Sequence, residues 1–427
     1  MKSNWILMKK LLLSVFILNA AILFCNADSE RVNRWQQMLP QATGTEKMDL
    51  LIELALHFLG KDPTLAIEYG NQALSIARKE ELKKKQVDIL SIITVAYEYR
   101  GNYHKCIALY EEALHLARQL NSSEIEANVL INLSTVHQNL GRHEISLKYN
   151  LQALEIFEKM ANKTGVAKTL NNIGNVYLYL EQIDEALEYY LRSVELKKET
   201  GNPSDLASGY HNLALAYQQK QFYDIALDYF DQALSLLEAE GDGYSLSICY
   251  MNLSNLHYLL QDYEIALQNG QRALQLSRMI ENEDGICINL NNIANILIKQ
   301  KQFDSVPEYL GQSHQLAMKN NNRDLIASNY KSYSEFYENI DQLGLALDFF
   351  RKYQALNDSI NNEMNKLIIA ELGIQYETTR REKEIELLKK EAAHQNQIRN
   401  YLIYALILGI ALIIFLLNLY YDKIRDG

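Results

Sequence analysis

Small residues recur along the chain at a constant interval of 40 residues, inside segments whose apolar positions follow helical spacing. The first small position is held by Ala66, Cys106, Ser146, Ala186, Ala226, Ala266, Val306 and Ala346. Seven residues later stand Ala73, Ala113, Ala153, Ser193, Ala233, Ala273, Ser313 and Tyr353, and three residues before it stand Tyr103, His143, Ile183, Tyr223, Tyr263, Phe303 and Leu343. A fixed interval of this length predicts copies of one structural unit, eight in this chain.

A second periodic segment precedes each of these, with apolar residues at i, i+3 and i+7, as in LNNIGNVYLYL and YHNLALAYQQK. Its central small residue is Ser134, Gly174, Ala214, Ser254 or Ala294. Two helices approach closely only where side chains are small, and large rings fill the space beside the crossing. The pattern predicts helical hairpins that cannot bury their own apolar faces and must stack on their neighbours.

Proline and glycine are scarce, with 4 and 18 residues, as expected for a chain built mostly of helices. The predicted turns carry Asn121, Gly201, Gly241 and Asn321, which suit left-handed helix ends. Pro307 falls in the first turn of the second helix of repeat seven, where proline is tolerated, so we expect that repeat to form.

These positions resemble the tetratricopeptide repeat family. The matching positions are Gly174/Ala214/Ala294, Tyr177/Tyr217, Ala186/Ala226/Ala266, Tyr110/Tyr190/Phe230 and Ala113/Ala153/Ala233. The resemblance implies an all-α, right-handed superhelical solenoid of eight helix-turn-helix units over residues 47–360. The usual family period is about 34 residues, and the proline that usually ends each repeat is absent, so we expect longer helices. HEAT repeats also run near 40 residues and are the alternative, but they lack this small and aromatic pattern.

An asparagine series shares the period in the first helix of repeats three to seven. It consists of Asn132, Asn172, Asn212, Asn252 and Asn292, with Asn175, Asn255 and Asn295 three residues later on the same helical face. The resemblance implies that this face lines a concave groove. Carboxamides both donate and accept hydrogen bonds, so the series would hold the backbone of a bound peptide or protein. The alternative is that each asparagine bonds the neighbouring repeat as a spacer between first helices.

The N-terminus has the layout of a signal peptide. Lys9 and Lys10 precede an apolar run of about 15 residues, and Cys25-Asn26-Ala27 is an acceptable cleavage site. We therefore expect a signal peptide at residues 1–27 and an N-terminal lead-in at 28–46, without lipidation of Cys25. An uncleaved signal anchor is the alternative, although the run is short for a membrane span.

The C-terminal region is predicted to reach and cross a membrane. Residues 361–400 form a charged helical linker, with a short heptad trace at Ile385, Leu388 and Ala392 that could support a coiled-coil dimer. Residues 401–421 contain no charge and are long enough for a transmembrane helix, with a short tail at 422–427. Together with the export signal, this predicts a single-pass protein of a bacterial inner membrane, with the repeats periplasmic or extracellular and the C-terminus cytoplasmic.

Charge, cysteine positions and the lack of catalytic motifs argue against several classes of function. The net charge of -11 argues against nucleic-acid binding, which needs a basic face. Cys106, Cys249 and Cys287 are isolated, so we expect core residues and neither a disulfide nor a metal site. His137 and His257 replace Tyr177 and Tyr217 in the repeat and are interpreted as packing residues. No catalytic motif is recognisable, so we expect no enzyme activity and no cofactor.

The whole layout resembles the extracytoplasmic sensor part of bacterial tetratricopeptide membrane regulators, whose output is a histidine kinase or a DNA-binding domain. The sequence ends six residues after Tyr421 without such a domain. Three functions stay open: a membrane-anchored binding module for signal sensing or complex assembly, a truncated or split sensor kinase or transcriptional regulator, and a structural scaffold of an envelope complex.

Overall fold

The computed structural model describes residues 31–360, 389–390 and 399, and the regular structure within them is entirely helical. The labelled helices are α2 Gly44–Phe58, α3 Pro63–Lys79, α4 Lys83–Tyr99, α5 Tyr103–Gln119, α6 Ser123–Asn139, α7 His143–Lys159, α8 Lys163–Tyr179, α9 Ile183–Thr200, α10 Pro203–Gln219, α11 Tyr223–Glu240, α12 Gly243–Leu259, α13 Tyr263–Met279, α14 Glu283–Lys299, α15 Val306–Lys319 and α16 Arg323–Asn339. Residues 31–38 and 343–360 are also helical.

The segments that the sequence predicts to enter or approach a membrane lie almost entirely outside the described residues. The predicted signal peptide at 1–27 and the predicted span at 401–421 are outside the described residues, as is most of the linker at 361–400. Among the helices that are described, none combines the length and the apolar composition of a bilayer crossing.

The 40-residue period is the length of two helices and two short connections. In repeat two, α4 and α5 have 17 residues each, and three residues separate α4 from α5 and α5 from α6. Even-numbered helices open each repeat and are called first helices here. The odd-numbered helices and residues 343–360 close the repeats and are called second helices. This arrangement confirms the predicted series of helical hairpins.

Every connection from α3 onward contains a left-handed residue, and these residues recur every 20 positions. They are Glu81, Gly101, Asn121, Gly141, Ala161, Glu181, Gly201, Gln221, Gly241, Gln261, Glu281, Lys301, Asn321 and Asp341. After most of them the next residue donates its backbone N–H to the carbonyl five positions back, as from Asn102 to the Tyr97 carbonyl at 2.9 Å. This Schellman arrangement satisfies the last carbonyls of the helix. The predicted left-handed positions Asn121, Gly201, Gly241 and Asn321 are confirmed.

Asparagine and aspartate side chains cap the helices that follow these turns. Asn162, Asn202, Asn282 and Asn322 each accept a hydrogen bond from a backbone N–H in the first turn of the next first helix, and Asp242 accepts two. Such caps satisfy donors that have no partner inside the helix. The short connection therefore ends one helix and starts the next within three residues.

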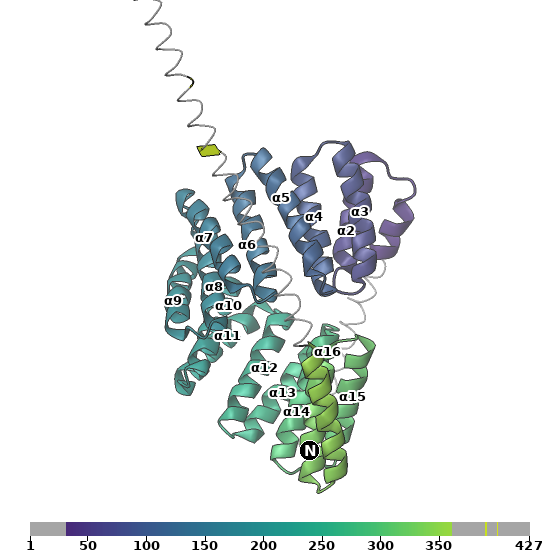
Figure 1. Ribbon diagram of the computed structural model, residues 1–427, viewed down its shortest axis with the longest axis vertical. Helices are drawn as coiled ribbons and strands as arrows, with labels where there is room; N and C mark the ends of the chain where they lie inside the picture. Colours follow the sequence, from purple (N-terminus) through teal and green to yellow (C-terminus); the bar gives the residue numbers. More distant parts are fainter. Residues whose placement is uncertain (1–30, 361–388, 391–398, 400–427) are drawn as a thin grey trace, which may run out of the picture. The chain divides into compact units, whose positions relative to one another are not determined.

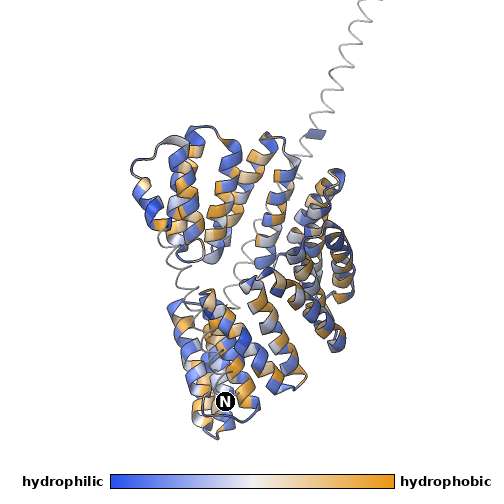
Figure 2. Cartoon of the chain, turned by 180° about the vertical axis from the view of Figure 1, so that it is seen from behind, coloured by the Kyte–Doolittle hydropathy of each residue, from blue (hydrophilic) through white to orange (hydrophobic). Residues whose placement is uncertain are grey.

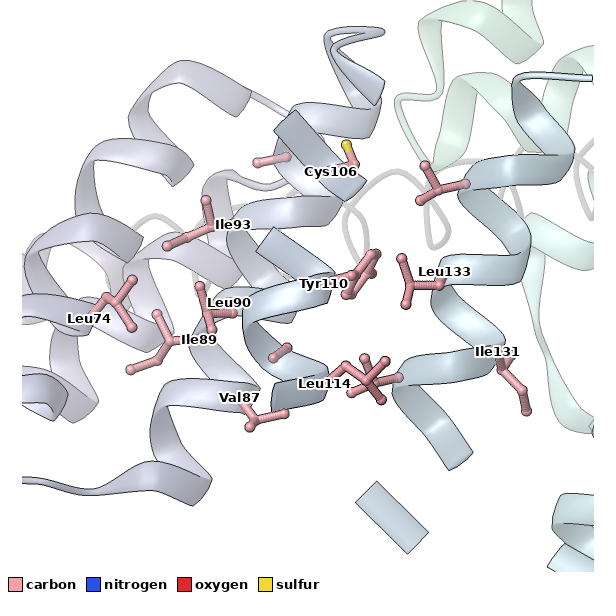
Figure 3. Close-up of a cluster of buried hydrophobic side chains, with 14 of the residues drawn as sticks. Leu74, Val87, Ile89, Leu90, Ile93, Cys106, Tyr110, Leu114, Ile131 and Leu133 are labelled. Atoms are coloured by element: carbon pink, nitrogen blue, oxygen red, sulfur yellow. The ribbon is translucent and has the colours of Figure 1, made fainter. Parts of the chain in front are cut away.

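The described part of the chain divides into two compact units, with the boundary between Leu316 and Ala317. In the first unit, each helix from α2 to α14 packs on the next along the chain (Figure 1). Apolar and polar residues are interspersed along the helices (Figure 2). Figure 3 shows Leu74 of α3, Ile93 of α4, Tyr110 of α5 and Leu133 of α6 meeting in one continuous core that crosses repeat boundaries.

The periodic small positions lie where the helices cross. The side chains from Ala66 to Val306 in the first series are fully buried. Gly174 lies directly against the ring of Tyr190, and a Cβ at this glycine would come within 2.6 Å of the ring. Gly165 has the same relation to Phe157, at 2.3 Å. Small residues under large ones thus set how closely the helices approach.

Repeat seven starts its second helix late. The other complete second helices from α5 to α13 have 17 or 18 residues, whereas α15 begins at Val306 and has 14. Pro307 has no N–H to donate to a preceding turn, so the helix cannot extend normally in front of it. The repeat forms as predicted, and Val306 and Leu310 are fully buried.

Gly174→Ala should lower the free energy of unfolding by about 1–3 kcal/mol, because the added methyl group overlaps the buried ring of Tyr190. Gly344→Ala is the control, since nothing lies within 4 Å of its added Cβ and its φ is not positive. Urea unfolding followed by circular dichroism measures both. Equal stability of the two variants would contradict this account of the crossing.

Candidate functional site

The first helices of neighbouring repeats touch one another in the first unit. α2 packs on α4, α6 on α8, α8 on α10 and α12 on α14, whereas successive second helices do not pack together in this way. The side of a stacked array on which neighbours come closest is its inner side. Within residues 44–299, the surface of the first helices is therefore the inner surface, and it is called the first-helix face here.

The five main asparagines of the series are half-buried on this face. Three of them bridge first helices of adjacent repeats. Asn212 donates to Asn171 Oδ1 at 3.0 Å, and Asn252 donates to His211 Nε2 at 3.1 Å. In the next pair of repeats, Asn292 donates to Asn255 Oδ1 at 3.2 Å. The structure therefore gives these asparagines the spacer contacts that the sequence left as an alternative.

Two further members of the series have partners inside their own repeat. Asn175 Oδ1 accepts from the hydroxyl of Tyr190 at 2.7 Å, which ties the first helix to the second. Asn295 donates to Asn291 Oδ1 at 3.1 Å, while its own Oδ1 is buried without a hydrogen bond among the described residues.

Asn132 and Asn172 differ from the rest. Neither side chain makes a hydrogen bond to any residue of the described stretch 31–360, and both amides keep some exposure to solvent. They stand at equivalent positions of repeats three and four. A half-buried carboxamide without a partner is suited to receive an external donor or acceptor. Peptide contact by the series stays a prediction, and these two residues are its best-placed candidates.

A buried lysine completes the network in repeat four. Lys197 of α9 is only 6% exposed, and its Nζ donates to Asn171 Oδ1 at 3.3 Å. Burial lowers the pKa of Lys197 to about 8. Asn171 thus accepts from both Lys197 and Asn212, which joins α8, α9 and α10 at one oxygen.

Sequence reasoning missed Asn171, His211 and Lys197. The paired asparagines at 171–172 and 291–292 are the signal that could have indicated a second polar position beside the series. Lys197 had no such signal, because equivalent positions of other repeats hold Ala77, Ala117 and Leu237.

His137 is buried and His211 is half-buried, and the pKa values of both lie well below that of a free histidine. His137 stacks on Tyr149 with ring centroids 5.5 Å apart, which confirms its packing role. Burial and then the nearby Arg142 lower the pKa of His137 to about 4. Burial also lowers the pKa of His211 to about 4, consistent with its Nε2 accepting from Asn252 as a neutral ring.

Cys106, Cys249 and Cys287 are free and buried, which confirms that they are core residues. No group of side chains suited to hold a metal ion occurs within the described part of the chain.

The family model of the tetratricopeptide repeat matches residues 89–159, 126–199 and 205–279. No curated protein matches the sequence. Two peptide or factor complexes are among the similar solved structures. The Rap conjugation gene regulator of the plasmid pLS20 in complex with the Phr* peptide is 16% identical, with a TM-score of 0.55 over 79% of this chain and 96% of that chain. A Rap protein complexed with Competence and Sporulation Factor is 15% identical, with a TM-score of 0.52 over 79% and 99%.

A third similar structure is a Signal Transduction ATPase with Numerous Domains from Pyrococcus horikoshii, which has a tetratricopeptide repeat sensor. It is 17% identical, with a TM-score of 0.53 over 80% of this chain and 55% of that chain. At these identities the likeness shows a shared fold.

Acidification should destabilise the protein between pH 6.5 and 4. An unfolded histidine has a pKa of about 6.5, so in this window the unfolded chain binds protons that folded His137 and His211 refuse. Each histidine should reduce the free energy of unfolding by roughly 2–3 kcal/mol when pH 4 is reached. Urea midpoints measured at several pH values test this.

His211→Asn, which copies Asn171 of the preceding repeat, should make the pH dependence shallower. His104→Asn, at an exposed position of α5, is the matched control and should leave the slope unchanged. If His211→Asn keeps the full pH dependence, proton exclusion from His211 is not its source.

Proposed function

We propose that this chain, in which residues 89–199 and 205–279 match the tetratricopeptide repeat model, is a protein–protein interaction module whose first-helix face binds a peptide or a protein segment. The observation that carries the proposal is the pair of partnerless carboxamides, Asn132 and Asn172, in a series whose other members are already bonded. The peptide named in the complex of the similar Rap regulator supports the same role for this fold.

The chemistry of the face suits a polypeptide backbone. The NH2 group of a carboxamide can donate to a peptide carbonyl, and its oxygen can accept from a peptide N–H. Because the two asparagines are half-buried, a ligand that bonds them would also exclude water from the contact. Hydrogen bonds shielded in this way contribute more than bonds made in open solvent.

The bridging asparagines have a different part in this proposal. Asn212, Asn252 and Asn292 hold neighbouring first helices at fixed spacing through bonds of 3.0 to 3.2 Å. A face whose repeats are fixed before binding loses less conformational entropy when a ligand arrives. The series would thus divide into residues that set the spacing and residues that contact the ligand.

We further propose that this binding module is anchored in a membrane. The export signal at 1–27 and the apolar segment at 401–421 are sequence features that favour a membrane-anchored module on the extracytoplasmic side. In this role the protein binds without catalysis and passes the bound state to a partner, in signal sensing or in assembly of a complex.

Asn132→Ala combined with Asn172→Ala should weaken peptide binding by about 30-fold, since two hydrogen bonds of about 1 kcal/mol each are lost. The probe is a set of 12-residue peptides retained by the full-length protein in detergent from a randomised library, and fluorescence anisotropy measures their Kd. The thermal midpoint should not change, because neither side chain has an internal partner.

Asn269→Ala, on the second helix α13, is the matched control and should bind like the unchanged protein. Asn212→Ala should instead lower stability, because it leaves Asn171 without one of its donors. Full peptide affinity in the Asn132 and Asn172 double variant would refute the proposed contact.

The membrane part is tested separately. After cell fractionation, the full chain should sediment with membranes and resist carbonate extraction, and a variant ending at residue 400 should be released. Protease added to intact spheroplasts should digest the repeats. Protection of the repeats from protease would contradict the proposed orientation.

A further inference from the structure

Formal charges are nearly absent from five successive first helices. In α6, α8, α10, α12 and α14, Lys168 and Lys299 are the only Asp, Glu, Lys or Arg residues beyond the first helical turn. α12 contains none in its 17 residues. Helix surfaces in water normally carry charges, so this stretch of face is unusual for a solvated surface.

The second helices carry the charges instead. α11 has Asp224, Asp228, Asp231, Glu238 and Glu240 and no basic residue. α9 has five acidic and three basic residues over its length. Both kinds of helix belong to the same repeats. The charged residues are therefore concentrated on the second-helix side of each repeat, and not in one part of the sequence. The second helices therefore supply most of the charge that keeps the array in solution.

Apolar side chains accompany the carboxamides on the first-helix face. Tyr179 is 67% exposed, and Leu259 is 52% exposed. Each lies seven residues after an asparagine of the series, Asn172 and Asn252, and so shares its helical face. Between them, Leu215 is half-buried at the position that Asn175 and Asn255 hold in neighbouring repeats. The face thus offers apolar contacts and neutral hydrogen-bonding groups, and few counter-charges.

We infer that the segment bound by this face is an uncharged, largely apolar stretch of polypeptide, held by its main chain and not by ion pairs. The inference rests on the proposed function of the face. A ligand carboxylate, phosphate or ammonium group placed against α10 or α12 would be partly desolvated without an opposite charge to compensate it. A neutral segment meets no such cost, and its backbone matches the carboxamides.

The dependence on salt follows from the same feature. Screening weakens contacts between exposed charges and leaves neutral hydrogen bonds and apolar contacts nearly unchanged. Binding to this face should therefore differ by less than about twofold in Kd between 50 and 500 mM NaCl, whereas an ion-pairing site would weaken clearly over this range.

The test uses the full-length protein in detergent and a bead library of 12-residue peptides randomised at every position. Retained peptides are sequenced, and three soluble versions of one of them are compared: the neutral peptide, one with four added Glu and one with four added Lys. We expect retained sequences depleted in Asp, Glu, Lys and Arg, and a neutral peptide that binds at least about tenfold more tightly than both charged versions.

A pair of matched variants separates recognition from general stickiness. Leu259→Glu places a charge on the first-helix face and should shift the preference towards the Lys peptide. Leu191→Glu places the same charge on the second helix α9, at a leucine that is 40% exposed, and should leave the preference unchanged.

Retained peptides enriched in charged residues, or affinity that falls steeply with salt, would overturn the inference and leave peptide binding intact. Equal effects of Leu259→Glu and Leu191→Glu would also overturn it. If the library yields no retained peptide, the proposed function fails together with the inference.

Discussion

The fold depends on the fact that one helical hairpin of this chain cannot bury its own apolar face. Each hairpin closes over a small residue, as Gly174 lies against Tyr190, and its remaining apolar surface must be covered by the next hairpin. The core therefore runs along the array, as in the contacts of Ile93, Tyr110 and Leu133 across repeats (Figure 3). Everything that could serve binding lies on the surfaces that this stacking leaves uncovered.

The asparagine series acts at the same boundaries. Stacking alone fixes which helices touch, and the bonds of Asn212, Asn252 and Asn292 add polar contacts between successive first helices. Neutral side chains can do this at half-buried positions without the desolvation cost of ion pairs. The buried Lys197 is the exception. Burial lowers its pKa to about 8, because its charged form is less favourable there than in water. The nearly uncharged face and the polar bridges are thus two results of one constraint on partly buried groups.

Much of this could be predicted from sequence, because the repeat assigns each residue a position in its unit. The small crossing residues, the left-handed turns at Asn121 and Gly201, and the formation of repeat seven around Pro307 follow from local rules that act the same way in every copy. The partners of the polar residues could not be predicted. Whether Asn212 faces a ligand or Asn171 depends on the offset between neighbouring first helices, which is set by side-chain packing and not by the period. Lys197 escaped prediction because it breaks the pattern of its position.

The left-handed residue that recurs every 20 positions has a consequence for how such a chain can change over time. Most helices from α3 onward end and begin through a connection of two or three residues that contains this left-handed residue, so a segment cut at two equivalent connections is one complete 40-residue repeat. Gain or loss of one 40-residue repeat would keep the same kind of contact at every remaining boundary between repeats. It would lengthen or shorten the inner surface by one first helix. Recombination between repeats could thus tune the length of the bound segment while the individual contacts stay the same.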